Sequence, residues 1–175
     1  MEKILITYAP KGGYTEMVAS RICSKLDNVE YVCIAGSDLT VEIFREFSNI
    51  IIGVATLGSD SWNSGNLDDD SVHLQKIITY FDFSNKKVAL FGLGNSILYP
   101  SNFVDEIGIY AKKIEEKNAK LIGFTSTEGY NFRDSKALIS SNTLSGLALD
   151  NDNESEKTEL RLNDWLQQII SEFKA

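Results

Sequence analysis

The stretch "ITYAPKGGYTEMVA", residues 6–19, places an apolar run, a tight glycine turn and a helical pattern next to one another. This order is typical of a loop that binds phosphate, because the backbone N–H groups at the start of the helix point at the ligand. The turn itself reads Ala9-Pro10-Lys11-Gly12-Gly13-Tyr14-Thr15 and carries one hydroxyl suited to phosphate oxygens. Three interpretations follow: a working phosphate site, an altered one, or a plain strand-to-helix turn.

On both sides of this stretch, apolar runs alternate with amphipathic segments along the chain. The run Asn49–Val54 is apolar enough to need cover on both faces of a sheet. Such alternation predicts an α/β fold, a doubly wound sheet of five parallel strands with helices on both faces. We expect strands at residues 3–8, 29–34, 49–54, 87–93 and 120–124, and helices at 15–26, 40–47, 73–81, 103–117 and 156–173.

One segment breaks the rhythm. Residues 125–147 are rich in Ser, Thr, Asn and Gly, and a strand pattern resumes at Leu147-Ala148-Leu149. A structureless loop of this length is unusual in a compact domain, so we expect an insertion with short strands of its own that splits strand five. The length of 175 residues suits a single domain over residues 1–175.

Composition narrows the class of protein. A net charge of −8, without a basic stripe, argues against nucleic acid as a partner. The apolar runs are shorter than the roughly 20 residues that span a bilayer, and Met1-Glu2-Lys3 leads directly into a strand, so a cytoplasmic protein without a membrane segment is expected. Cys23 and Cys33 lack metal or dithiol spacing and are expected in the core. With one histidine, His73, a catalytic triad is poorly supported, and chemistry would come from a bound cofactor.

In doubly wound sheets a ligand lies beyond the carboxyl ends of the strands, where the strand order reverses. The loops at residues 9–15, 55–66 and 94–103 follow the first, third and fourth expected strands. The second loop carries Trp62 and the third carries Tyr99. Two aromatic side chains at one end of a sheet can enclose a flat aromatic ligand.

The chain resembles flavodoxins of the long-chain type. The resemblance is carried mainly by "VALFGLGNSILYPSNF", "TSTEGYNF", "SKAL" and "GLALDNDNESEKTELRLNDWL" in the C-terminal half, and the first half matches in pattern more than in letters. It implies the strand order 2-1-3-4-5, FMN at the switch point, and a protein that carries single electrons between redox enzymes. It also implies that the insertion marks the long-chain subgroup.

By this resemblance, the phosphate of FMN would bind at Pro10, Lys11, Gly12, Gly13, Tyr14 and Thr15. Gly13 and Thr15 match the family pattern, whereas Pro10 and Gly12 replace hydroxyl residues. Backbone donors remain from Lys11 onward beside the positive end of the helix, and Lys11 can add a positive charge. Each lost neutral hydrogen bond is worth roughly 0.5–1.5 kcal/mol, so the altered loop is expected to work with changed affinity.

The resemblance also implies which residues contact the rest of the cofactor. Thr56, Leu57 and Gly58 would cover one face of the flavin ring, with either Leu57 or Trp62 over the ring. The Gly58 carbonyl would accept a hydrogen bond from flavin N5 once that atom is protonated. Tyr99 would stack on the other face. Further expected contacts are Gly94, Asn95 in place of the usual Asp, Phe103, and Asp152 at the ribityl hydroxyls.

The expected function is therefore an FMN-dependent, low-potential, one-electron carrier rather than an enzyme. Acidic residues such as Asp68, Asp69, Asp70 and Asp152 would make adding an electron to the flavin costly. The expected partners are a basic-faced reductase and an acceptor enzyme, with the carrier itself a monomer.

Two alternatives stay open at this point. One is a flavodoxin-like flavin enzyme of the NAD(P)H quinone reductase type, and the other is an interaction module with a degraded phosphate loop. A phosphorelay receiver is excluded, because Tyr8-Ala9 and Val54-Ala55 stand where it needs carboxylates.

Overall fold

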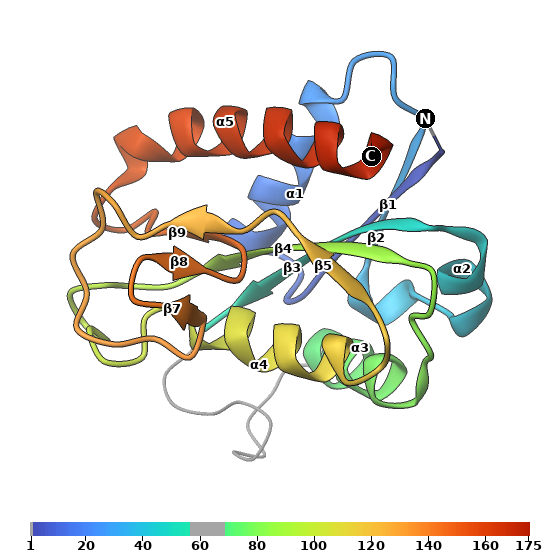
Figure 1. Ribbon diagram of the computed structural model, residues 1–175, viewed down its shortest axis with the longest axis horizontal. Helices are drawn as coiled ribbons and strands as arrows, with labels where there is room; N and C mark the ends of the chain where they lie inside the picture. Colours follow the sequence, from blue (N-terminus) through green and yellow to red (C-terminus); the bar gives the residue numbers. More distant parts are fainter. Residues whose placement is uncertain (1, 57–68) are drawn as a thin grey trace.

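The computed structural model describes residues 2–56 and 69–175, and its centre is one parallel sheet (Figure 1). The strand order is β2-β1-β3-β4-β5, and β9 also pairs with β4, so that β5 and β9 form the two halves of strand five. The predicted fold class and the split of strand five are confirmed. The strands are β1 (Ile4–Tyr8), β2 (Tyr31–Ala35), β3 (Asn49–Ala55), β4 (Lys87–Leu93), β5 (Lys120–Ile122) and β9 (Leu147–Leu149).

Helices cover both faces of this sheet, as the apolar sequences of β3 and β4 require. α1 (Tyr14–Lys25) and α5 (Ser155–Lys174) lie on one face, and α3 (Asp69–Tyr80) and α4 (Asp105–Glu115) lie on the other (Figure 1). Each face has its own apolar core. The first contains Ile22 of α1 and Trp165 of α5, and the second contains Leu74 of α3 and Ile107 of α4. A 3₁₀ turn, η1 (Gly36–Asp38), and α2 (Val41–Glu46) connect β2 to β3.

The insertion forms a small antiparallel sheet in the order β6-β8-β7, as expected. Its strands are β6 (Thr125–Ser126), β7 (Leu138–Ser140) and β8 (Thr143–Leu144). Gly108 of α4 lets the insertion approach closely, because a Cβ built there would lie 1.9 Å from the Lys136 carbonyl oxygen. One helical turn away, Asp105 Oδ1 accepts a hydrogen bond from the Lys136 N–H at 2.8 Å. The insertion is therefore fixed to α4 through its backbone.

Several element boundaries differ from those expected from the sequence. α3 begins at Asp69 rather than at His73. α4 begins at Asp105 rather than at Phe103, because Val104 is in the left-handed region with φ 49° and ends the turn before the helix. β5 ends at Ile122, where Gly123 turns the chain with φ 77°.

The prediction that both cysteines lie in the core is wrong for Cys33, which is exposed, whereas Cys23 is half-buried. Cys33 lies on β2, an edge strand that, in the described part of the chain, pairs with β1 alone. Within residues 2–56 and 69–175, no helix combines the length and the apolar character needed to cross a bilayer. The same residues bring no three His, Cys, Asp or Glu side chains together as a metal site.

Candidate functional site

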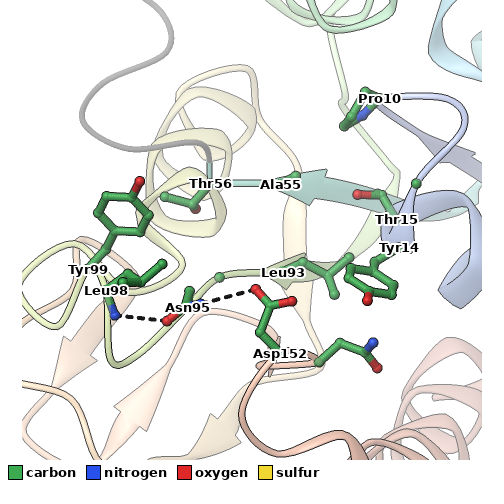
Figure 2. Close-up of a pocket in the computed structure, with 13 residues that line it drawn as sticks. Pro10, Tyr14, Thr15, Ala55, Thr56, Leu93, Asn95, Leu98, Tyr99 and Asp152 are labelled. Carbon is green, nitrogen blue, oxygen red and sulfur yellow. Dashed lines mark hydrogen bonds between the residues drawn. The ribbon is translucent and has the colours of Figure 1, made fainter.

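A cavity of about 390 Å³ lies at the carboxyl ends of β1, β3, β4 and β9 (Figure 2). This volume falls within the range of small-molecule sites. The sheet topology explains the position, because β1 and β3 are neighbours whose following connections leave on opposite faces. Of the residues proposed from sequence, the cavity brings together Pro10, Gly13, Tyr14, Thr15, Thr56, Gly94, Asn95, Tyr99 and Asp152. It also contains Ala55, Leu93, Leu98 and Asn151.

The start of α1 forms one end of the cavity. Gly13 precedes the helix and offers no side-chain cap, so the helix begins at Tyr14 with its first N–H groups free of a capping side chain. Figure 2 shows Tyr14 and Thr15 at this end, with the Thr15 hydroxyl directed toward the cavity. Free N–H groups and the positive end of the helix dipole favour an anion here.

Lys11 and Gly12 do not line the cavity. The Lys11 N–H donates to Asp70 Oδ2 at 2.8 Å, and the Gly12 N–H donates to Glu16 Oε2 at 2.6 Å. The Lys11 ammonium lies 3.0 Å from Asp38 Oδ2 and also donates to the Ser37 hydroxyl. Two of the backbone donors expected for phosphate, and the expected positive charge, are thus engaged by acidic side chains of the protein.

The floor of the cavity is apolar and is made by the last residues of β3 and β4, Ala55 and Leu93. The next residue, Thr56, fixes the beginning of the following loop. Its N–H donates to the Leu93 carbonyl at 2.9 Å, and its hydroxyl accepts from the Glu106 N–H at 3.1 Å. This part of the cavity is therefore rigidly attached to both β4 and α4.

The opposite end is formed by the loop after β4, which carries Tyr99 (Figure 2). Asn95 shapes this loop, because its side-chain oxygen accepts from the N–H groups of Ile97 and Leu98 at 3.2 and 2.8 Å. Its side-chain amide donates to Asp152 Oδ2 at 3.1 Å. Tyr99 is 43% exposed, which leaves its ring accessible to a flat ligand.

Asp150, a fully buried residue that sequence reasoning missed, connects the loops after β4 and β9. Its carboxylate accepts from the Ser96 N–H at 2.8 Å and the Ser96 hydroxyl at 2.6 Å. On the other side it accepts from the Asn153 N–H and side-chain amide. Burial by itself raises the pKa of Asp150, but the hydrogen bonds from Ser96 and Asn153 outweigh it and hold the pKa below its ordinary value. An ionised Asp150 thus joins the Tyr99 loop to the loop of Asp152.

Comparison with known proteins agrees with this geometry. Residues 6–165 match the family model described as flavodoxin. A flavodoxin of Nostoc sp. (strain PCC 7120) is 39% identical over 172 residues, covering 98% of each chain. The chain belongs to the flavodoxin family. A flavodoxin of Buchnera aphidicola is 36% identical over 175 residues, covering 99% of this chain and 98% of that relative.

Among solved structures, a Fusobacterium nucleatum flavodoxin bound to flavin mononucleotide superposes with a TM-score of 0.85 at 28% identity. The match covers 98% of this chain and 99% of that one. Flavodoxins are electron-transfer proteins rather than enzymes, so the alternative hypothesis of an NAD(P)H quinone reductase is not supported. The length and the insertion are consistent with the long-chain type.

Six of the residues proposed for this flavodoxin are not part of the described cavity, and Lys11 and Gly12 are two of them. Leu57, Gly58 and Trp62 lie outside the described residues, so their proposed roles stay predictions. Phe103 is fully buried and packs against Phe132, with 5.3 Å between ring centroids, so it supports the Tyr99 loop from the core.

The additional cavity residues carry different signals in the sequence. Ala55 and Leu93 could have been predicted from the sequence, because they end apolar strands whose carboxyl ends define the site. Leu98 and Asn151 directly precede predicted residues, but nothing in their own side chains distinguishes them.

Acidic groups lie beside the loop that leads into α1 in this flavodoxin. Burial and a hydrogen bond to Glu16 raise the pKa of Tyr8, whose hydroxyl lies 2.9 Å from the Glu16 carboxylate. Burial also acts to raise the pKa of Asp70, but hydrogen bonds from Ser37 and the Lys11 N–H lower it further than burial raises it. Asp70 is therefore ionised at neutral pH and stays beside the loop as a negative charge.

Proposed function

We propose that the chain binds FMN in this cavity and carries single electrons at low potential between redox partner proteins. The observation that carries the proposal is the layout of the cavity, with the start of α1 at one end and Tyr99 at the other (Figure 2). Membership of the flavodoxin family and the likeness to a Fusobacterium flavodoxin bound to flavin mononucleotide support this choice of cofactor.

The residues present fit FMN in their chemistry. The first N–H groups of α1 and the Thr15 hydroxyl suit the phosphate, and the apolar floor with Tyr99 suits the flavin ring. Asn95 and Asp152, which lie between the two ends, suit the ribityl hydroxyls. FMN supplies the ability to gain and lose one electron at a time. The protein's part is to hold it, exclude water from one side and set the electrostatic potential around it.

The proposal of a low potential rests on charge. Asp152 lines the cavity, and Asp70 stands beside the loop that leads into α1. The whole chain carries a net charge of −8. Adding an electron beside fixed negative charges costs free energy, because like charges repel more strongly where protein replaces water. The bound flavin is therefore a stronger reductant than the free one.

Partner proteins would reach the flavin beside Tyr99. The neighbouring Ile97 and Leu98 are 70% and 69% exposed and form an apolar edge next to the cavity. An apolar edge on an acidic protein suits transient docking to partners with basic faces, in line with the proposed reductase and acceptor enzyme. We propose further that the carrier is a monomer in the cytoplasm.

A potentiometric titration of the FMN-loaded protein tests the function. Two separate one-electron steps are expected, with the second clearly below the potential of free FMN, and Asp152→Asn should raise that second potential. A single two-electron step at the potential of free FMN would contradict the proposal. NADPH added alone should leave the flavin oxidised, whereas rapid bleaching would favour the enzyme alternative.

A further inference from the structure

Cys23 and Cys33, whose spacing in the sequence indicates neither a metal site nor a dithiol motif, lie on the face of the sheet that α1 covers. Cys23 lies in the last turn of α1, and a short connection returns the chain to β2. Cys33 of β2 is directly paired with Ile6 of β1, whose side chain belongs to the core beneath α1. Since directly paired residues of neighbouring strands point to the same face, Cys33 faces α1. Cys23 packs against the same core from α1, so the two thiols lie on one face of the sheet, close enough for each to shift the pKa of the other.

The two thiols differ in accessibility. Cys33 is exposed at the edge of the sheet, whereas Cys23 is half-buried and packs against the core of α1 and α5. The neighbouring Cys23 thiol lowers the pKa of Cys33, although burial and the nearby Glu16 carboxylate act in the opposite direction. Exposure and a larger thiolate fraction are the properties of an oxidisable cysteine.

We propose that Cys23 and Cys33 form an intramolecular disulfide bond when the protein meets a hydroperoxide. The Cys33 thiolate attacks one peroxide oxygen, the O–O bond breaks, and Cys33 becomes a sulfenic acid as hydroxide leaves and takes up a proton. The Cys23 sulfur then attacks the Cys33 sulfur, the S–O bond breaks, and water leaves with the thiol proton. In sum, two thiols and one hydrogen peroxide yield one disulfide and two water molecules.

The bond would join the end of α1 to the edge strand of the sheet. The cysteines enclose a short loop, so closure removes freedom mainly from the unfolded chain and raises the midpoint of thermal unfolding. Neither cysteine lines the cavity at the other end of α1. Oxidation of Cys23 and Cys33 is therefore independent of the proposed flavin chemistry.

The test uses the full chain, treated with hydrogen peroxide in the dark at neutral pH and analysed by intact mass without reductant. The expected product is a monomer lighter by about 2 Da, the mass of two hydrogen atoms. Alkylation after denaturation should add two groups to untreated protein and none to the product. A tryptic digest should link the peptide of residues 22–25 to that of residues 26–45, and a reductant should separate them.

Cys23→Ser and Cys33→Ser are matched controls. Cys23→Ser should convert Cys33 to oxygenated forms or to a dimer between chains, and Cys33→Ser should react much more slowly. Oxygen added to Cys33 in the wild-type chain, without the loss of two hydrogens, would overturn the proposal. So would a disulfide found only between two chains. Equally fast oxidation of the Cys33→Ser variant would refute Cys33 as the attacking thiol.

Discussion

Replacing Asp150 by Asn should destabilise the protein far more than a change of one atom suggests. Asp150 is fully buried, and one of its oxygens, Oδ2, accepts both the N–H and the hydroxyl of Ser96. In the Asn variant both hydrogen bonds from Ser96 lose their charged acceptor. Where the amide nitrogen replaces Oδ2, an N–H donor faces the N–H and the hydroxyl of Ser96. Hydrogen bonds to charged groups are worth roughly 1.5–3 kcal/mol each, so we expect a loss of about 3–5 kcal/mol of unfolding free energy.

Urea unfolding followed by circular dichroism measures this loss, and the midpoint of thermal unfolding should fall by roughly 10 °C. Asp152→Asn is the matched control, because Asp152 is exposed and accepts a hydrogen bond from the side-chain amide of Asn95. Its cost should stay below about 0.5 kcal/mol. Equal stability of the two variants would refute the argument that Asp150 joins the two loops.

Three further results are expected. Folding lowers the pKa of Asp150, so its contribution to stability is present above about pH 4 and is lost as the pH falls through the pKa of the folded state. The difference in unfolding free energy between wild type and Asp150→Asn should therefore narrow on acidification. Urea unfolding at several pH values measures this difference. Gly108→Ala should cost about 1–3 kcal/mol in the same assay, because its Cβ would overlap the backbone of the insertion; an unchanged midpoint would contradict this packing. In fluorescence titrations, Thr15→Val should weaken FMN binding roughly tenfold and leave riboflavin binding unchanged. Lys11→Ala removes an ion pair to Asp38 outside the cavity, so it should change FMN affinity less than about threefold.

The fold was predictable because its signals are local and repeated. The apolar run of β3 requires cover on both faces, and the pattern at Leu147–Leu149 reveals that strand five resumes after the insertion. The position of the site followed from the same pattern, since parallel strands with this order place their ligand at one edge. Tyr99 and Thr15 were found because they stand in the loops that this rule selects.

What escaped prediction depends on contacts between distant residues. In the sequence, Asp150 is an acidic residue in the turn after a strand. Its role in joining two loops depends on a hydrogen bond from Ser96, which is distant in the sequence. The direction of the Lys11 ammonium is decided by Asp38 on another connection. The meeting of Cys23 and Cys33 depends on how α1 packs on an edge strand, which spacing along the chain does not reveal.

A parallel titration of FMN and riboflavin into the flavin-free chain, followed by flavin fluorescence, tests the central claim most directly. The layout of the cavity predicts one FMN per chain with strong quenching by Tyr99, and at least roughly tenfold weaker binding of riboflavin, because the phosphate meets the start of α1. In Tyr99→Ala, FMN should bind more weakly and keep more of its fluorescence. Equal affinity for both flavins, or quenching unchanged in Tyr99→Ala, would contradict this account of the site.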